Sequence, residues 1–522
     1  MYRASEKMKQ PDIWKNPGLE MGRRTREIFE DVEGWHNRFR QDVTNRVNED
    51  IFKPLYNEVM GAPNAPIRIL VAMMALKEAQ GISDEQLYEQ ARFNTLIRNA
   101  LGLFNSDEEV PTESTYYLFR QKVSEYAEQT GKNLLEEAFE QITKDQCHEY
   151  KVSGKQIRMD SKLLGSNIGY YSRYGIIHET IRKYCHSNGI ENPAGKDKEL
   201  SAVLSEKADA VTYRSTKEEV ERLLESMGIL MSRLLGAEGG EKNKEYELLK
   251  RVFEEQYDLV RGPGGGKKKK VQLREKSQIS AKSVQNPHDP DSEYRDKGGN
   301  KVKGYSVNVT ETCDGSTPDS VLLNLIVGIQ TAGSSTPDVD FLQEGIEKAQ
   351  KLVVDKIEEA HTDGAYHSPE NQKFCKQENI DLVLRGIQGK PSIYDLLFDA
   401  EGNLIVVNKE NGRQLEAKLV KSRSHESPQR WTIEDGEKRR VFERKDVETC
   451  ELRKQLEQIP KDKLNVRNNV EATLFQLGYH YRNDKSNYRS LFKHSLWAIS
   501  RCIWINFRRI QLWSMRKMMN VG

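Results

Sequence analysis

The sequence predicts an α/β protein in which a mixed sheet is covered by helices, with a helical N-terminal domain, a helical insertion and a β-rich insertion. Residues 1–150 show apolar residues at helical spacing and no strand-like run. From residue 302 onward, alternating strand-like runs and amphipathic helical runs follow one another, which is typical of a sheet covered by helices. A chain of 522 residues is long enough for more than one domain.

The N-terminal domain, residues 1–150, is predicted to be helical and to bind DNA. Its expected helices run over residues 66–80, 83–101 and 112–141. Pro66 opens the first helix and Gly81 ends it, while Ser83 and Gln86 have the spacing of a capping box that opens the second. Helix, short glycine turn and helix is also the outline of a helix-turn-helix, and a plain helical bundle is the alternative.

The catalytic domain is predicted over residues 151–480, with a helical insertion at 165–300 and a β-rich insertion at 390–447. A short strand is expected to end at Asp160, and a second strand to end just before Asp363. The remaining expected elements are a hairpin over 302–332, helices over 338–352 and 369–378, and a strand at 381–387.

Two basic segments are candidate DNA contacts. The run from Arg261 to Lys270 combines glycines with four lysines and is predicted to be a flexible cationic linker; the lysines are Lys267, Lys268, Lys269 and Lys270. A solvated linker without function is the alternative. The C-terminal segment, residues 481–522, is predicted to be helical, and it carries nine Lys or Arg residues against one acid, interleaved with tryptophans. Phosphate contacts are expected there, including from Arg482 and Lys485.

Composition narrows the class of protein. The charged fraction is 31% but the net charge is only +1, so charge must be judged locally. The six cysteines show no Cys-x-x-Cys spacing, which favours reduced thiols in the cytoplasm. The chain has no apolar signal core and no run of about 18 apolar residues. We therefore expect a soluble protein with no membrane contact.

Three acids are the candidate catalytic and metal-binding residues: Asp160, Asp363 and Glu471. Alternation along Ile157-Arg-Met159 places Asp160 on the face opposite two buried side chains. Glu471 lies on a helix beside an apolar stripe and one turn after Arg467, so those two share a face. Judged singly, each acid is more often a cap, a turn residue or a solvated side chain. Together, three carboxylates can hold two divalent ions, which is the chemistry of phosphodiester cleavage.

These pieces, taken in order, resemble the DDE transposases of bacterial insertion sequences, whose catalytic domain has the ribonuclease H-like fold. The resemblance spans most of the chain. Its segments are residues 50–150, IRMDSKLLGSN around Asp160, residues 289–294 with the following GGNKVKGYSVNV, HTDGAYHS around Asp363, and DLVLRGI. Tyr294, Lys303 and Tyr366 are expected to border the site.

The third acid departs from the family pattern in part. Such transposases often carry Tyr-x2-Arg-x3-Glu-x6-Lys on the last catalytic helix. Arg467 and Glu471 fit that pattern, whereas Leu464 stands at the tyrosine position and Gly478 at the lysine position. Arg467 is a candidate phosphate contact, and Lys485 or Arg482 are candidates to replace the lysine.

The resemblance implies two Mg²⁺ or Mn²⁺ ions held by the three carboxylates. It also implies cleavage of double-stranded DNA at the ends of a mobile element, followed by transfer of the 3′ end into target DNA. Because two ends must be held together, a homodimer on DNA is implied, in the cytoplasm of a bacterium and associated with its nucleoid. The alternatives are a related nuclease that does not join strands and a transposase-derived DNA-binding protein that has lost catalysis.

Two further sets of residues are expected to have structural rather than catalytic roles. His361 and His367 flank Asp363, but imidazole is not the ligand that Mg²⁺ prefers, so packing is expected. Asp289 and Asp291 surround a proline, which favours a turn.

Overall fold

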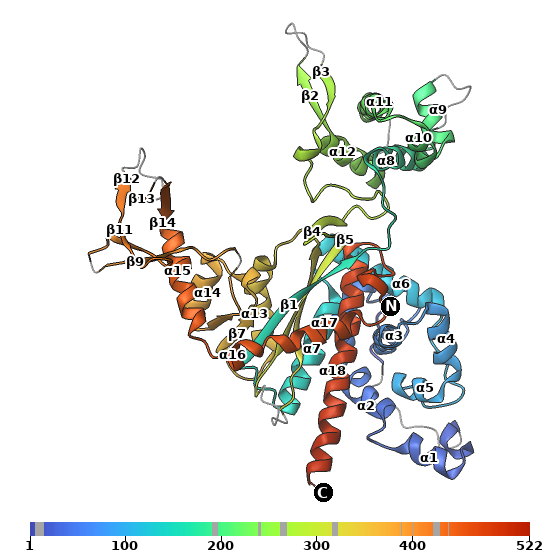
Figure 1. The fold of residues 1–522 in the computed structure, drawn as a ribbon. Helices are drawn as coiled ribbons and strands as arrows, with labels where there is room; N and C mark the ends of the chain where they lie inside the picture. Colours follow the sequence, from blue (N-terminus) through green and yellow to red (C-terminus); the bar gives the residue numbers. More distant parts are fainter. Residues whose placement is uncertain are drawn as a thin grey trace.

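A computed structural model describes residues 1–5, 15–190, 197–237, 242–261, 269–315, 322–387, 389–399, 401–420, 429–436 and 438–521. It has the mixed α/β architecture that the sequence predicts, with helices at the N-terminus and a β-rich part toward the C-terminus (Figure 1). None of the helices in the described ranges has the length and apolar character needed to cross a membrane.

A six-stranded mixed sheet forms the centre of the molecule. Its strands are β1 (Gln156–Gly165), β4 (Glu293–Lys297), β5 (Asn300–Thr312), β6 (Ile326–Gly333), β7 (Glu359–Thr362) and β8 (Asp381–Leu384). The order is β4-β5-β1-β7-β8, with β6 also paired to β5. Strand β5 is antiparallel to β1, β4 and β6, whereas β1, β7 and β8 are parallel to one another.

Strand β1 is longer than predicted. Asp160 lies in its middle, opposite Val309 of β5, and the expectation that the strand ends at Asp160 is wrong. Pairing continues to Gly165 opposite Gly304, because Gly304 lets the two backbones come close. A Cβ atom at Gly304 would lie 2.1 Å from the Leu164 carbonyl oxygen.

The two faces of β1 are covered by different helices. Ile157 and Met159 are fully buried in a core that includes α13 (Leu342–Leu352), and α14 (Pro369–Glu378) lies on the same side of the sheet. Asp160 points to the opposite face, as the alternation predicts, toward α17 (Asn468–Gly478).

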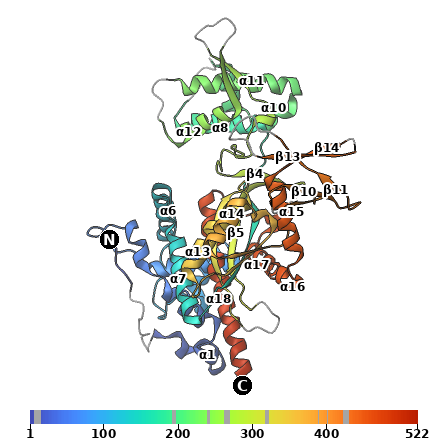
Figure 2. The ribbon, with the colours of Figure 1, turned by 90° about the vertical axis from the view of Figure 1, so that its left-hand side faces the viewer.

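The N-terminal helices gather around the C-terminal helix, which covers that second face, and the last of them, α7, also contacts β6 and α13 (Figures 1 and 2). They are α1 (Arg23–Glu30), α2 (Trp35–Asp42), α3 (Ile67–Gln80), α4 (Asp84–Phe93), α5 (Thr95–Leu101), α6 (Glu113–Thr130) and α7 (Leu134–Tyr150). The capping box of Ser83 and Gln86 is present. Two predicted helices are each divided in the structure: Asn94 caps α5 and interrupts the second, and Gly131, in a left-handed conformation, ends α6.

The helical insertion stands away from the sheet (Figures 1 and 2). It contains α8 (Arg173–Ser187), α9 (Lys198–Ser205), α10 (Ala208–Arg214), α11 (Lys217–Leu235), α12 (Lys244–Gln256), β2 (Tyr257–Arg261) and β3 (Lys269–Leu273). The ends of the predicted flexible linker are paired strands, since Arg261 pairs with Lys269 and Val260 with Lys270. Cross-strand pairing, which a glycine- and lysine-rich composition does not signal, makes these ends a hairpin.

The β-rich part follows β8. It consists of two three-stranded sheets, one of β9 (Tyr394–Phe398), β10 (Leu404–Asn408) and β11 (Gln414–Glu416), the other of β12 (Lys418–Val420), β13 (Arg430–Asp435) and β14 (Lys438–Glu443). Helices α15 (Arg444–Glu457) and α16 (Lys461–Asn465) lead from it back to the central sheet and α17.

The C-terminal helix, α18 (Leu491–Val521), is the central spine of the molecule. Trp497 and Phe507 are buried, and so is Arg501, whose guanidinium donates to backbone carbonyls of residues 78, 79, 476 and 477. Arg509 bonds the buried Glu311. Arg501 and Arg509 therefore hold the protein together, and the predicted phosphate contacts of this segment would have to come from its other basic side chains.

Candidate active site

The structure brings the three predicted acids together around one arginine. Arg467, which is 9% exposed, lies just before α17, and its guanidinium contacts Asp160 of β1 and approaches Asp363, which follows β7. Its Nη2 forms an ion pair with Asp160 Oδ2 and lies 3.9 Å from Asp363 Oδ2, and its Nη1 lies 3.6 Å from Glu471 Oε1. Residues 160, 363 and 471 come from a strand, a loop and a helix that are far apart in sequence.

Asp363 is positioned by its own turn. It follows β7 directly and caps the short helix η8 (Gly364–Tyr366), accepting a hydrogen bond of 2.8 Å from the Ala365 amide. A Cβ atom at Gly364 would lie 2.4 Å from the Gly386 carbonyl oxygen, so the glycine allows the segment after β8 to approach. The Asp363 side chain remains 31% exposed and accessible from solvent.

Glu471 is the most exposed of the three acids. It lies in the first turn of α17, and 61% of its side chain is exposed. The helix itself is anchored by Val470, Leu474 and Leu477, which are buried as the apolar stripe predicts. Glu471 therefore stands at the rim of the site, on the Arg467 side.

A fourth acid lies near the three. Asp338, at the start of η7 (Asp338–Phe341), is 3% exposed and accepts a hydrogen bond of 2.6 Å from the Ser161 hydroxyl. Its other oxygen is 3.7 Å from Arg295 Nη2. Sequence reasoning missed Asp338, because an acid at the start of a helix is ordinarily a cap.

Burial and the neighbouring acids raise the pKa values of two groups at the site, Asp160 and Tyr366. Burial raises the pKa of Asp160 to about 6, against the lowering effects of Arg467 and of the Ser161 amide, and the charges of Asp363 and Asp338 add to the rise. Burial and the charges of Asp160, Asp338 and Asp363 also raise the pKa of Tyr366. The Tyr366 hydroxyl therefore stays protonated and donates a hydrogen bond of 2.6 Å to Asn308 Oδ1.

The donor set suits a hard divalent cation, since Asp160, Asp363 and Glu471 offer only carboxylate oxygens. Among the residues that the structure describes, no three His, Cys, Asp or Glu side chains are arranged to hold a metal ion as they stand. The guanidinium of Arg467 lies between the carboxylates and sets their spacing. A cation would therefore enter this site by taking the place of the arginine charge.

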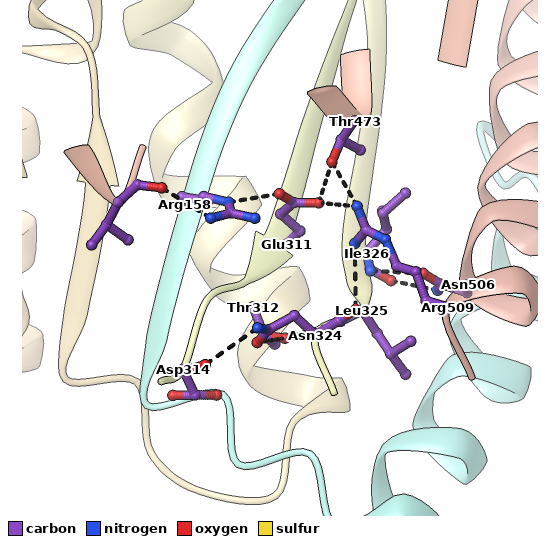
Figure 3. Close-up of polar contacts among 11 residues, drawn as sticks. Arg158, Glu311, Thr312, Asp314, Asn324, Leu325, Ile326, Thr473, Asn506 and Arg509 are labelled. Atoms are coloured by element: carbon purple, nitrogen blue, oxygen red, sulfur yellow. Dashed lines mark hydrogen bonds and ion pairs between the residues drawn. The ribbon is translucent and has the colours of Figure 1, made fainter. Parts of the chain in front are cut away.

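Helix α17 is fixed to the sheet by a buried ionic network that the sequence does not signal (Figure 3). Glu311 of β5 is fully buried and accepts from Arg158 Nε at 2.6 Å, Arg509 Nη2 at 2.7 Å and the Thr473 hydroxyl at 2.7 Å. Arg158 also donates to the Val466 carbonyl at 2.9 Å. The segment that carries Arg467 and Glu471 is therefore held on both sides, at Val466 and at Thr473. Burial, which would raise the pKa of Glu311, is outweighed by Arg509 and Arg158, so this pKa is lowered.

The other predicted residues are placed as follows. His361 is buried beside Glu359 and does not contact the acids around Arg467. Asp289 is 1% exposed and accepts hydrogen bonds from Tyr305, Ser166 and the Ser490 amide. Its structural role agrees with the predicted turn.

Of the predicted DNA-binding lysines in the 261–270 run, the two that the structure describes do not join the acids. Lys267 and Lys268 lie outside the described residues. Lys269 and Lys270 belong to the β2–β3 hairpin, which projects away from the central sheet (Figures 1 and 2). Arg482 and Lys485 lie in the turn after α17, and Lys485 forms an isolated bridge with Gly165 at the end of β1.

Comparison with known protein families identifies one region. Residues 28–122 match the family model of a transposase domain (DUF772). They extend from the end of α1 into α6, within the N-terminal helices that pack against the spine helix α18. No curated protein and no solved structure matches the chain. The match supports a transposase-related function and suggests a nucleic-acid-processing enzyme.

Proposed function

We propose that this protein is a DDE-type DNA transposase that cleaves the ends of an insertion sequence and transfers the freed 3′ ends into target DNA. The observation that carries the proposal is the convergence of Asp160, Asp363 and Glu471 on the one guanidinium of Arg467. Carboxylates at this spacing repel one another, and a fold that assembles them on one charge is suited to binding cations.

The sheet supports a ribonuclease H-like catalytic domain. Strands β6, β5, β1, β7 and β8 lie in that order, and only β5 runs against the others. The first acid lies on the central strand β1, the second follows the neighbouring strand β7, and the third lies on a helix after β8. This arrangement is the one expected for the fold.

Asp160, Asp363 and Glu471 would hold two Mg²⁺ or Mn²⁺ ions, which supply nucleophile activation and stabilisation of the leaving oxygen. Arg467 balances the carboxylate charge before the ions bind, and then faces the DNA phosphate beside Glu471. In cleavage, a water oxygen bonds to phosphorus as the bond to the 3′ oxygen breaks. In strand transfer, the freed 3′ oxygen bonds to a target phosphorus as a target P–O bond breaks.

The partners proposed are double-stranded DNA of the element ends and of the target. A homodimer on DNA follows from the need to hold two ends together. The location proposed is the bacterial cytoplasm, in association with the nucleoid.

The proposal is tested with purified protein, DNA that carries the inverted repeats flanking the coding region, and Mg²⁺. Asp160→Asn, Asp363→Asn and Glu471→Gln are each expected to reduce cleavage by at least about 100-fold, since each removes a charged ligand. Glu358→Gln, an exposed acid paired with Lys155, is the matched control and is expected to cleave normally.

Unchanged cleavage in all three variants would overturn the assignment of the site. Cleavage without joining of the 3′ ends to a second DNA would favour the nuclease. Binding of the repeats by wild-type protein without any cleavage would favour a transposase-derived DNA-binding protein.

A further inference from the structure

A basic cavity of about 490 Å³ lies along the second half of β1, the strand that carries Asp160. Ser161 and Lys162 of β1 form part of its wall, so it begins one residue after Asp160. Its charged lining is one-sided, with a single acid, Asp484, and five lysines: Lys162, Lys297, Lys301, Lys303 and Lys485. Such a lining attracts phosphate.

The cavity is built by close backbone contacts. The Ser486 amide donates to the Gly165 carbonyl at 2.8 Å, and Gly165 forms a bridge with Lys485. Asn483 and Asp484, with φ of 54° and 52°, both adopt the left-handed conformation that Asn and Asp tolerate. The Lys485 ammonium donates to the Ile168 carbonyl at 3.0 Å, which holds this charge at the wall.

Lys162 connects the cavity with the acids. It lies two residues after Asp160 and therefore on the same face of β1. Its side chain crosses Gly478 of α17, where a Cβ atom would lie 2.8 Å from Lys162 Cε and 3.4 Å from its Nζ. The Lys162 ammonium thus lies over position 478 of the helix, where the residue itself is a glycine. The same ammonium forms an ion pair of 2.7 Å with Asp484.

An exposed aromatic ring lies at the cavity. The Tyr170 side chain is 67% exposed, and Lys303 Nζ lies 5.1 Å from the centre of its ring. The ring is thus largely open to solvent, with a lysine ammonium beside it. Aromatic rings interleaved with basic side chains are the usual surface for unpaired bases, because each base can stack while the lysines meet its phosphates.

We propose that this cavity binds unpaired DNA strand next to the cleavage site, with phosphates on Lys301, Lys303 and Lys485 and a base stacked on Tyr170. The proposal rests on the proposed function, because it takes Asp160 as the site of cleavage. The cavity has the volume of a small-molecule pocket, which admits about one or two nucleotides and not a duplex. Lys162 keeps the strand in line with Asp160, from which it is two residues away.

The experiment measures binding of a fluorescently labelled oligothymidylate to the full-length protein, without divalent metal, by anisotropy over a series of salt concentrations. Tyr170→Ala is expected to weaken binding by about 5- to 100-fold, the effect of losing one stacked base, and Tyr170→Phe to keep it. Lys301→Gln is expected to reduce the salt slope by about 0.7, the loss of one phosphate contact on a single strand. Lys356→Gln, an exposed lysine distant in sequence from the cavity, is the matched control.

The results separate this proposal from the proposed function. If Tyr170→Ala and Lys301→Gln both bind the oligonucleotide as tightly as the wild type, the cavity proposal is overturned, whatever their cleavage activity. An equal loss of affinity for blunt duplex DNA would also overturn it, by showing a general phosphate surface. If Tyr170→Ala and Lys301→Gln lose affinity for the oligonucleotide while Asp160→Asn still cleaves normally, the cavity binds single strands but the proposed active site fails, and with it the place of the cavity next to cleavage.

Discussion

Arg467 is the residue on which the candidate site depends. Its guanidinium lies within 4.0 Å of all three acids and compensates their charge in the metal-free protein. The burial of Asp160 sets a second constraint, because it raises the pKa of this carboxyl to about 6. The ionised form that would bind a cation is thus held at a cost in stability, which is common at functional sites.

The folded-state pKa of Asp160, about 6, lies above its ordinary value of 3.8. The folded protein therefore binds more protons than the unfolded chain between about pH 4 and pH 6, and stability falls as pH rises through that window. Asp160→Asn removes the cost of ionising this buried carboxyl. The change that it causes in the free energy of unfolding of the metal-free protein is expected to be more favourable at pH 8 than at pH 4, by on the order of 2 kcal/mol. Thermal unfolding in EDTA at the two pH values measures this difference. An effect of Asp160→Asn that is the same at both pH values would contradict the prediction.

At the scale of elements, α17 is the one whose placement decides the site. It supplies Glu471, and the residue before it is Arg467. Glu311 holds it through Thr473, and Arg158 holds the preceding turn through the Val466 carbonyl (Figure 3). Removing Glu311 itself would leave Arg158 and Arg509 buried without their counter-ion, which is strongly destabilising. Thr473 is therefore the more informative position.

Thr473→Val keeps the size of the side chain and removes its hydrogen bonds to Glu311 and Arg509. We expect a loss of about 1–3 kcal/mol in stability, because buried polar groups lose a partner. We also expect cleavage to fall by more than the folded fraction, because Glu471 is no longer held in register. Circular dichroism and cleavage of repeat-containing DNA measure the two effects. Thr449→Val on α15, where the hydroxyl bonds the Lys445 carbonyl of its own helix, is the matched control. A fall in cleavage that only follows the folded fraction would argue against a positioning role.

At the scale of the whole molecule, α18 joins the N-terminal helices to the sheet. Trp504 packs on Trp35 and Phe39, and Phe39 also meets Phe507 with ring centroids 5.2 Å apart. On the other side, the Asn506 amide pairs with both backbone groups of Ile326 on β6, each at 2.8 Å (Figure 3). The transposase-domain region and the sheet with the acids thus share one core.

Phe507→Ala tests this shared core. Phe507 is fully buried, so its truncation is expected to cost about 3–5 kcal/mol. If the core is shared, the N-terminal helices and the sheet lose stability together, and tryptophan fluorescence and far-ultraviolet circular dichroism report a single, earlier transition. Met518→Ala, at a side chain that is half exposed near the end of α18, is expected to leave the transition unchanged. Two separate transitions in Phe507→Ala would indicate independent units.

Local signals in the sequence determined most elements and the candidate acids. The capping box at Ser83, the proline at 369 that opens α14 and the alternation around Asp160 are read from neighbouring residues, and the structure has each of them. The wrong predictions concern contacts between residues that are far apart in the sequence. Asp160 lies within its strand rather than at its end, because pairing with a strand about 150 residues away extends β1.

Only the tertiary structure decided what surrounds the acids. The sequence by itself determined that Arg467 and Glu471 share a helical face, but not that Arg467 lies between Asp160 and Asp363. The contribution of Asp338, the burial of Glu311 with two arginines, and the passage of Lys162 over Gly478 were equally hidden. The physical reason is the same in each case: these contacts join residues far apart in the chain, and their energies depend on burial, which local periodicity does not encode.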